Sequence, residues 1–592
     1  MNTTAEAIEK LIRSDEARYG KIAAQAGEEC KKLIRSFRDK ADWYSGWSHH
    51  FACPDCASNL IYDPDLDFNP PNRFVCPNCG KEVSGQAMDE AWVYFYRQDT
   101  AARLESVAVC ALQGDEEARN FMEAFFDFYA ENYAAFPLHG HEGGKIMPQI
   151  LDEAVWCILA MRGLYPCRKL FSPEKKAFWY ENMFLPLATL IDDPIHQKHL
   201  HNHVLWYKAA VGAIGLCFED QALLDHALNG ERGIREHAEQ GFTKEGFWQE
   251  GSPFYHYYTL EALTGFCQFF ADQFPNDPLL LLLERVYLSP LRLSFDSWTL
   301  PSINDGWFPL PLDKFADQFH RAARASRSEK LIEYAEKIRE KDPQAFDKAS
   351  SLLLDPPPVS LEIWESTKLA VIRKPFFAIL KSGAIIRSHM HRDFLSLIIP
   401  PFSKDLGTPG YGHALYKSWY QLAAAHNTLT VDGDQSHYLI PTHVESCGEG
   451  VKAVIDGGWD VISSAHRILT PQGDTLRDEM EIACPEEHQL DWIFHAEGQA
   501  EFSVQPGEDA FAGQEWGYEY LTDVKKIPCG DMLKVSFTME NARLTLTLDT
   551  RGMEVLTARS PGNPADLLRT AVILRTKGKT ARFLASYQVE SL

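Results

Sequence analysis

Hydrophobic residues recur every three or four positions through most of the first 350 residues, the spacing of amphipathic helices. This spacing predicts helices over residues 105–136, 147–164, 173–191, 203–216 and 255–274. Residues that end helices stand between these stretches, at Pro137, Pro166, Pro194, Gly241 to Gly246, and Pro275. The spacing of hydrophobic residues and helix-ending residues therefore predicts an array of helix pairs joined by short connections.

The pattern changes at residues 354–358, where three consecutive prolines predict a linker because proline is excluded from helix interiors. Beyond this point apolar and polar residues alternate, which predicts strands at 369–372, 377–380, 428–431, 533–537 and 543–548. Asp432-Gly433 and Pro506-Gly507 are typical of turns. We therefore expect an α+β multidomain chain, divided into a helical segment over 1–100, a helical domain over 101–354 and a β domain over 359–592.

Composition narrows the class of protein. The chain has 592 residues, 45% of them hydrophobic and 12% aromatic, which predicts a globular protein of more than one domain. A net charge of -25 argues against a nucleic-acid partner, which would require a basic face. No apolar run reaches the ~18 residues of a membrane span, so no membrane partner is expected.

The N-terminal sequence, Met1-Asn2-Thr3-Thr4-Ala5-Glu6, lacks the apolar core of a secretory signal. The 13 cysteines are an odd number and mostly scattered, as in proteins of reducing compartments. These features predict a cytoplasmic protein, or a periplasmic one if a leader has been removed. The sequence leaves the oligomeric state open, a homodimer included.

Four cysteines near the N-terminus have the spacing of a metal site. Cys53 and Cys56 form one CxxC pair, and Cys76 and Cys79 form a second one 19 residues later. Two such pairs can place four thiolates tetrahedrally around Zn²⁺. We therefore predict a structural zinc ribbon over residues 53–79. The alternative is a pair of loops that have kept the cysteines without a metal.

A second candidate site combines histidines with a carboxylate. His389, His391 and Asp393 alternate along a strand-like run, and alternate residues of a strand point to the same face. Two imidazoles and a carboxylate on one face are typical of a metal site, a proton-transfer site, or both.

Two polar and aromatic clusters open predicted helices in the first half of the chain. They cover residues 199–207, which contain three histidines and an asparagine, and residues 248–258. Helix N-termini offer free N–H groups and suit an anionic ligand. The alternative is that these histidines are ordinary core residues with satisfied hydrogen bonds.

Read in order, these motifs resemble those of the heparinase II/III-like polysaccharide lyases, to which alginate and chondroitin lyases are related. The resemblance covers about residues 145–498. It rests on the motifs Asn202-His203, Ser252-Pro253-Phe254-Tyr255-His256, His389-x-His391-x-Asp393, Asp405-Leu406-Gly407-Thr408, Ala425 to Gly433, and Asp491 to His495. One departure is Leu406, which stands where the family has proline.

The resemblance implies an N-terminal α/α toroid, an incomplete helical barrel, followed by a C-terminal antiparallel β-sandwich. It also implies that the enzyme cleaves uronic-acid glycans, either glycosaminoglycans such as heparan, chondroitin and hyaluronan, or alginate. Cleavage would occur by β-elimination and leave a 4,5-unsaturated uronate. The expected partner is therefore an acidic poly- or oligosaccharide.

Matching motif positions assigns roles to individual residues. Asn202 and His203 would neutralise the substrate carboxylate, Tyr255 would protonate the leaving oxygen, and His389 would be the second acid/base group. His391, Asp405 and His426 match the family's metal ligands, which suits Zn²⁺ or Mn²⁺. Candidate substrate contacts are His201, Gln149, Glu250, Arg392 and Trp307.

Two other functions compete with the lyase hypothesis. A glycoside hydrolase on the same scaffold would use paired carboxylates such as Glu245, Glu250 or Asp305. A non-catalytic glycan-binding protein would keep the fold with a degenerate site. Only the lyase creates an unsaturated uronate that absorbs in the near ultraviolet.

Overall fold

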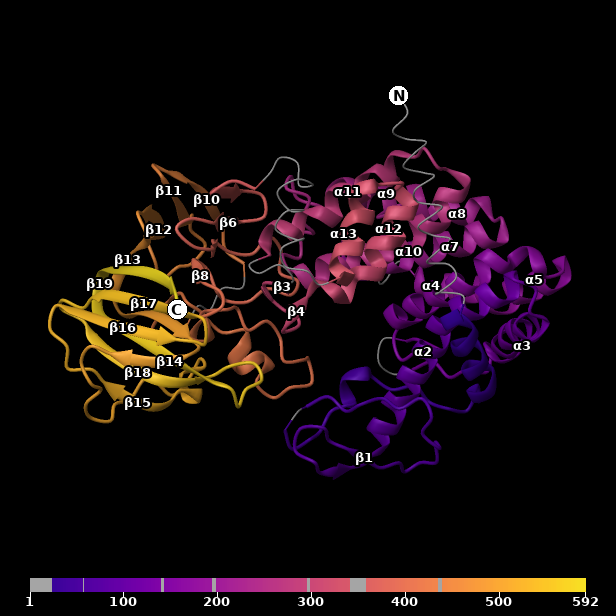
Figure 1. Cartoon of the computed structure of the whole chain (residues 1–592), viewed down its shortest axis with the longest axis horizontal. Helices are drawn as coiled ribbons and strands as arrows, with labels where there is room; N and C mark the ends of the chain where they lie inside the picture. Colours follow the sequence, from indigo (N-terminus) through magenta and orange to yellow (C-terminus); the bar gives the residue numbers. More distant parts are fainter. Residues whose placement is uncertain are drawn as a thin grey trace. The chain divides into compact units, whose positions relative to one another are not determined.

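The computed structural model describes residues 24–56, 58–139, 143–193, 199–294, 299–340, 358–434 and 439–592 (Figure 1). Two compact units make up the chain, and both are discontinuous in sequence. The first comprises Met1–Gly241, Tyr258–Tyr287 and Asp317–Ala335, and the second Phe242–Tyr257, Leu288–Ala316 and Glu336–Leu592. The predicted linker at 354–358 lies almost wholly outside the described residues, so the domain boundary there stays a prediction.

The first unit is helical. Its helices, of which the last four extend beyond it, are α2 (Gln86–Leu112), α3 (Glu116–Asn132), α4 (Ile150–Cys167), α5 (Pro173–Trp179), α6 (Leu185–Ile191), α7 (Asn202–Phe218), α8 (Gln221–Asn229), α9 (Ile234–Gln240), α10 (Pro253–Gln273), α11 (Pro278–Leu288), α12 (Ala316–Ser326) and α13 (Glu329–Glu340). A two-stranded hairpin of β1 (Phe74–Val75) and β2 (Glu82–Val83) flanks the second cysteine pair, Cys76 and Cys79.

Two predicted helices are interrupted in the structure. The helix expected over 105–136 is wrong as one element, because Gly114 adopts a φ of 91° and Asp115 caps a new helix. The Asp115 side chain accepts hydrogen bonds from the backbone N–H groups of Glu117 and Ala118. The helix expected over 173–191 contains a π-helical segment at Tyr180–Phe184 between α5 and α6. Hydrophobic spacing alone misses such local breaks.

The second unit is dominated by antiparallel sheets. A small sheet has the order β5 (Leu361–Trp364), β6 (Leu369–Ile372), β7 (Ala378–Lys381) and β8 (Ser396–Ile398), and β3 (Thr299–Leu300) pairs with β4 (Leu310–Pro311). The main sheet contains β9 (Leu429–Val431), β10 (Thr442–Cys447), β11 (Gly450–Ile455), β12 (Ser464–Gln472), β13 (Thr475–Ala496), β14 (Gln499–Phe502), β15 (Thr522–Lys526), β16 (Met532–Thr538), β17 (Ala542–Asp549), β18 (Glu554–Pro561) and β19 (Leu568–Ser591).

The two long strands β13 and β19 organise the main sheet (Figure 1). They pair with each other along most of their length, with a register shift between Ala483 and His488. Beyond the shift, β13 also pairs with the short strand β9, and β19 with β18. The predicted α+β class, helical first and antiparallel β second, is confirmed.

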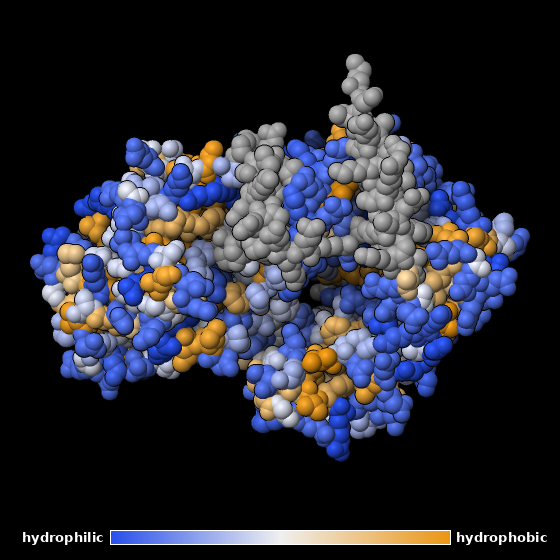
Figure 2. Space-filling model, viewed as in Figure 1, coloured by the Kyte–Doolittle hydropathy of each residue, from blue (hydrophilic) through white to orange (hydrophobic). Residues whose placement is uncertain are grey.

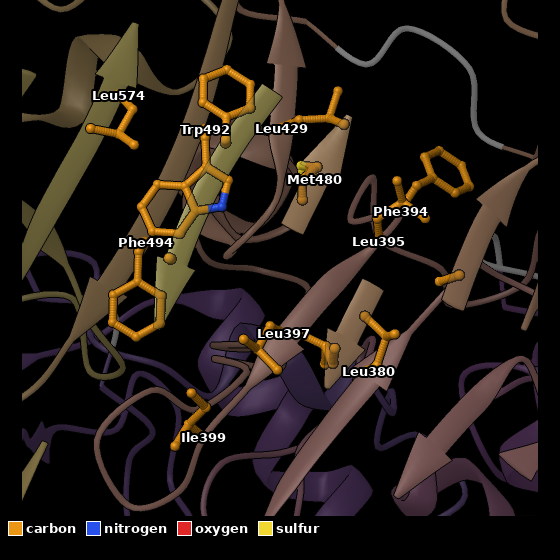
Figure 3. Close-up of a cluster of buried hydrophobic side chains, with 14 of the residues drawn as sticks. Leu380, Phe394, Leu395, Leu397, Ile399, Leu429, Met480, Trp492, Phe494 and Leu574 are labelled. Carbon is orange, nitrogen blue, oxygen red and sulfur yellow. The ribbon is translucent and has the colours of Figure 1, made fainter. Parts of the chain in front are cut away.

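A large hydrophobic cluster forms the main core of this unit (Figure 3). Phe394, Leu395 and Leu397 follow the histidine motif directly, and each is at most 1% exposed. They pack in one cluster with Leu429 of β9 and Trp492 of β13. Burying such side chains contributes about 1.5–3 kcal/mol each, so the segments that carry the candidate site residues are anchored in the core.

The face shown in Figure 2 is predominantly hydrophilic, with small scattered hydrophobic patches, in keeping with 24% charged residues. In the part of the chain that the structure describes, none of the helices is apolar over enough of its length to span a bilayer.

A buried ion pair ties two segments of the site to the core. Arg467 is fully buried and donates to both oxygens of Asp478 at 2.9 and 2.6 Å. The same guanidinium donates to the backbone oxygens of Leu395 and Asn427 at 2.8 and 2.7 Å. Arg467 therefore joins the segment that follows His391 to the segment that follows His426.

Replacing this arginine should destabilise the β-rich unit. We expect Arg467→Met to lower its free energy of unfolding by about 3–5 kcal/mol, because Asp478 would remain as an unpaired buried charge. Urea unfolding followed by tryptophan fluorescence measures the change. The control is Arg582→Met, since that side chain is 53% exposed beside Glu479 and its loss should leave the transition unmoved. A loss below ~1 kcal/mol for Arg467→Met would contradict the assignment.

Candidate active site and metal centres

The histidine motif lies in a turn, so the predicted strand over His389 to Asp393 is wrong. The regular strand begins only at Ser396, in β8. His389 and Leu395 both adopt a φ of 58°, the left-handed region that interrupts strand alternation. The two histidines nevertheless converge, because both rings contact one carboxylate instead of sharing a strand face.

That carboxylate belongs to Asp305, which is 1% exposed. Its Oδ2 lies 3.2 Å from Nδ1 of His389 and 2.8 Å from the hydroxyl of Tyr416. Its Oδ1 lies 3.1 Å from Nε2 of His391 and 3.5 Å from the amide of Gln421. Burial alone would raise the pKa of Asp305, but the hydrogen bonds from both histidines outweigh burial and hold it well below its usual range.

Tyr255 and His389 are in direct contact within the second unit. Tyr255 lies in the first turn of α10, and its ring stacks on that of His389 with centroids 3.4 Å apart and planes 13° apart. The hydroxyls of Tyr255 and Tyr411 are hydrogen-bonded, and the Tyr411 hydroxyl lies 3.1 Å from Nδ1 of His389. Two of the predicted catalytic residues are therefore adjacent in one compact unit.

The environment of Tyr255 favours its neutral phenol. Burial raises its pKa above the ordinary value, and the nearby carboxylates of Asp305 and Glu250 act in the same direction. The hydrogen bond from Tyr411 opposes this shift without cancelling it. A neutral phenol can give up a proton to a leaving group, whereas action as a base first requires its ionisation.

His391, Asp405 and His426 form a buried group whose ligand atoms lie within 4.8 Å of one another. His391 donates from Nε2 to Asp305, and Nε2 of His426 lies 3.0 Å from the backbone oxygen of Tyr420. Both rings therefore turn the lone pair of Nδ1 toward the group. Among the described residues, Nδ1 of His391 and Oδ2 of Asp405 have no hydrogen-bond partner. Two unsatisfied buried acceptors are costly without a cation, so this donor set fits a metal ion.

Asp393 belongs to a separate ion pair beside this group. Lys381, 1% exposed, donates to its two oxygens at 2.6 and 2.8 Å and also to Oδ1 of Asn304. Burial raises the pKa of Asp393, but the Lys381 ammonium together with His426 and His391 brings it below its usual value. His426 lies further away, with Nδ1 at 3.9 Å from the carboxylate. Asp393 is thus the partner of a lysine in the core.

Three candidate substrate contacts lie in the second unit. Glu250 is 2% exposed, with Oε2 at 3.7 Å from Nε2 of His389. Trp307 is half-buried, and its ring centroid lies 6.2 Å from that of Phe254. Arg392 is 8% exposed, pairs with Asp434 at 3.2 Å and lies over the ring of Trp516. Arg392 is therefore already engaged by protein groups, and its contact with substrate stays a prediction.

The remaining candidates lie in the first unit. Asn202 begins α7 and is fully buried, and His201 caps that helix by accepting from the backbone N–H of His203 at 3.3 Å. The rings of His201 and His203 make an edge contact with centroids 4.6 Å apart. Gln149 is the N-cap position of α4. His201, Asn202 and His203 therefore cluster at the start of α7, where the sequence predicted a polar cluster opening a helix.

The four cysteines converge in the first unit. Sγ of Cys53 lies 3.7 Å from that of Cys79, and Sγ of Cys56 lies 3.5 Å from that of Cys76. A disulfide would require ~2.05 Å, whereas thiolates at ~2.3 Å from a tetrahedral Zn²⁺ lie ~3.8 Å apart. The backbone N–H of Cys79 is the main group that lowers the pKa of the Cys76 thiol, to about 6. This donor set fits a four-thiolate metal ion.

Sequence reasoning missed Tyr411 and Tyr416, and it named Asp305 only as a candidate carboxylate of the hydrolase alternative. One signal was available for Tyr411. It stands between two glycines, directly after the Asp405 motif, where a large aromatic residue has no packing role that the sequence reveals. Nothing in the sequence links Asp305 to the histidines 84 and 86 residues later.

Comparison with known proteins gives two kinds of sequence similarity. A family model described as "Alginate lyase" matches residues 174–277. An alginate lyase of Stenotrophomonas maltophilia (strain K279a) is 24% identical over 400 residues, which cover 58% of this chain and 52% of the relative. An exo-oligoalginate lyase of Saccharophagus degradans is 24% identical over 374 residues, which cover 55% and 50%. The chain thus matches about half the length of these curated relatives.

Structural comparison extends over more of the chain. A solved structure of a heparinase III gene product superposes with a TM-score of 0.60 at 13% identity, covering 95% of this chain and 84% of that one. At this identity the likeness shows the fold, and that fold is a helical toroid followed by a β-sandwich. In sequence the chain is similar to alginate lyases, and in fold it is similar to heparinase III, in agreement with the resemblance read from its motifs.

Proposed function

We propose that this chain is a polysaccharide lyase that cleaves uronic-acid glycans by β-elimination, with alginate or its oligosaccharides as the first substrate to test. The choice of alginate follows the relatives, which are described as alginate lyase and exo-oligoalginate lyase. Glycosaminoglycans are the second class, because the fold is shared with heparinase III.

The stacked pair of Tyr255 and His389 is the observation that carries the proposal. β-Elimination requires a base for the proton on C5 of the uronate and an acid for the leaving oxygen on C4. A phenol kept neutral by burial suits the acid. His389 suits the base, because Asp305 accepts the hydrogen on its Nδ1 and leaves the lone pair of the neutral ring on Nε2.

Neutralisation of the substrate carboxylate is the third requirement, because the C5 proton is acidic only when the developing enolate is stabilised. Asn202 and His203, at the start of α7, are the residues proposed for this role. An amide at a helix N-terminus supports negative charge without adding an ionisable group. His201, Gln149, Glu250, Trp307 and Arg392 remain the proposed sugar contacts.

The glycoside hydrolase alternative has less support. A hydrolase needs one carboxyl group that stays protonated and a second one within reach. Asp305 is held ionised by two histidines, and Glu245 is occupied by hydrogen bonds to Ser366 and Thr367. These contacts leave Glu250 as the remaining acid named for that mechanism.

Two metal ions are part of the proposal. His391, Asp405 and His426 would hold Zn²⁺ or Mn²⁺, whose charge would stabilise the buried donor set and brace the turn that presents His389. Cys53, Cys56, Cys76 and Cys79 would hold a structural Zn²⁺ that folds residues 53–79.

Lyase activity should depend on the Tyr255 hydroxyl. On alginate, heparan sulfate, chondroitin sulfate and hyaluronan, we expect the full chain to generate near-ultraviolet absorbance from an unsaturated uronate on at least one polymer. Tyr255→Phe should lower kcat on the order of 10²- to 10⁴-fold with little change in KM, because only the proton donor is lost.

Tyr520→Phe is the matched control, since its hydroxyl donates to Ser418 at 3.0 Å, away from His389. It should keep wild-type kinetics. Release of reducing ends without absorbance would refute elimination, and near wild-type turnover of Tyr255→Phe would remove that residue from the mechanism.

Metal binding at the group of His391, Asp405 and His426 should depend on the His391 side chain. In His391→Ala, metal analysis of the purified chain should show the loss of about one ion per chain, with a lower Tm because Asp405 loses its compensating cation. His443→Ala is the control, because His443 lies on the surface and pairs with Asp456. Equal metal content in wild type and His391→Ala would contradict the ligand assignment.

The predicted zinc ribbon should lose its ion without any change at the metal site of His391, Asp405 and His426. Cys53→Ser should remove about one zinc per chain while the β-unit ion is retained, since the two donor sets share no residue. Cys447→Ser, a cysteine outside both sets, serves as the control. If Cys53→Ser keeps the full zinc content, the four-thiolate site does not exist.

A further inference from the structure

A single buried carboxylate joins the proposed acid/base histidine to the proposed metal ligand. Asp305 accepts from Nδ1 of His389 on one oxygen and from Nε2 of His391 on the other, at 3.2 and 3.1 Å. The two histidines thus use opposite ring nitrogens toward the same group. Their remaining nitrogens, Nε2 of His389 and Nδ1 of His391, are the atoms that the two proposed tasks require.

We propose that Asp305 is a positioning residue that fixes opposite tautomers on His389 and His391, so that one ring keeps a basic Nε2 and the other a metal-binding Nδ1. This inference rests on the proposed lyase function for the role of His389. Its structural part, the assignment of two tautomers by one carboxylate, can be tested without any substrate.

The number of hydrogen-bond donors on each ring determines which of its nitrogens keeps a lone pair. An ionised carboxylate only accepts hydrogen bonds, so each ring nitrogen that faces Asp305 must carry the hydrogen. A neutral imidazole has one N–H, and the lone pair therefore lies on the opposite nitrogen. In His391 that nitrogen belongs to the group with Asp405 and His426. The Tyr411 hydroxyl also lies 3.1 Å from Nδ1 of His389, but a hydroxyl can donate or accept, so only the carboxylate of Asp305 fixes the tautomer of each ring.

The carboxylate is itself held from several sides. The backbone N–H of Asp305 donates to the backbone oxygen of His389 at 3.1 Å. The Tyr416 hydroxyl donates to it at 2.8 Å, and Gln421 donates to that hydroxyl at 2.8 Å. Its neighbour Asn304 donates to the backbone oxygen of Gly251 at 3.0 Å. These bonds leave Asp305 one orientation, which a positioning residue requires.

The decisive variant is Asp305→Asn, which keeps the shape but replaces one acceptor oxygen by an N–H donor. It should lower kcat on the order of 10²- to 10⁴-fold with KM within about threefold, as expected when a histidine loses the carboxylate that orients it. It should also weaken Zn²⁺ binding by about 10- to 100-fold in a chelator competition, the usual effect of losing a partner of a ligand.

A spectroscopic measurement tests the tautomers directly. In wild-type protein labelled with ¹⁵N-histidine, two-bond proton–nitrogen spectra should show His389 protonated on Nδ1 and His391 protonated on Nε2. The signals are assigned by their loss in His389→Gln and His391→Gln. This measurement on the wild type needs no Asp305 variant, so it decides the matter even if Asp305→Asn fails to fold.

Asp456→Asn is the matched control, because Asp456 contacts Nδ1 of His443 at 2.8 Å on the surface of the same unit. It should leave kcat, metal affinity and both tautomers unchanged. The inference is overturned if either wild-type histidine has the other tautomer, or if Asp305→Asn keeps wild-type turnover and metal affinity. Absence of lyase activity in the wild type would instead refute the proposed function, while the tautomer and metal measurements would still decide the role of Asp305.

Discussion

Several buried charges in the β-rich unit are paired with one another, and the candidate site is built on these pairs. Lys381 pairs with Asp393, Arg467 pairs with Asp478, and Asp305 lies between two histidines. An isolated charge in such surroundings would cost several kcal/mol. Each pair is therefore tolerated only with its partner in place, and the partners come from distant parts of the chain.

This mutual dependence gives the site its rigidity. The turn that carries His389 and His391 has no regular hydrogen-bond ladder of its own, and its left-handed residues would be unfavourable in isolation. Apolar side chains directly after the turn anchor it in the core, and Arg467 fastens its far end to the segment after His426. A rigid turn can hold an acid/base group and a metal ligand two residues apart without interference.

Short-range sequence patterns explain which elements and residues could be predicted. Long stretches of helical spacing and alternating strands are visible because hydrophobic periodicity reflects one buried face. The break at Gly114 and the turn at His389 were missed, since both depend on single residues with positive φ. The motifs proposed six candidate site residues: Asn202, Tyr255, His389, His391, Asp405 and His426. No motif pointed to Tyr416 or to the contacts of Asp305 with both histidines.

The sequence by itself determined the element types, the two cysteine pairs and the residues able to carry elimination chemistry, because these depend on short-range spacing and residue type. Only the tertiary structure decided that Tyr255 stacks on His389 and that Asp305 serves both histidines, since these contacts join residues 134 and more than 80 positions apart through shared burial. It also placed opposite ring nitrogens of the two histidines against Asp305. The lone pair each ring presents is set by a partner elsewhere in the fold, which the motif His389-x-His391 cannot specify.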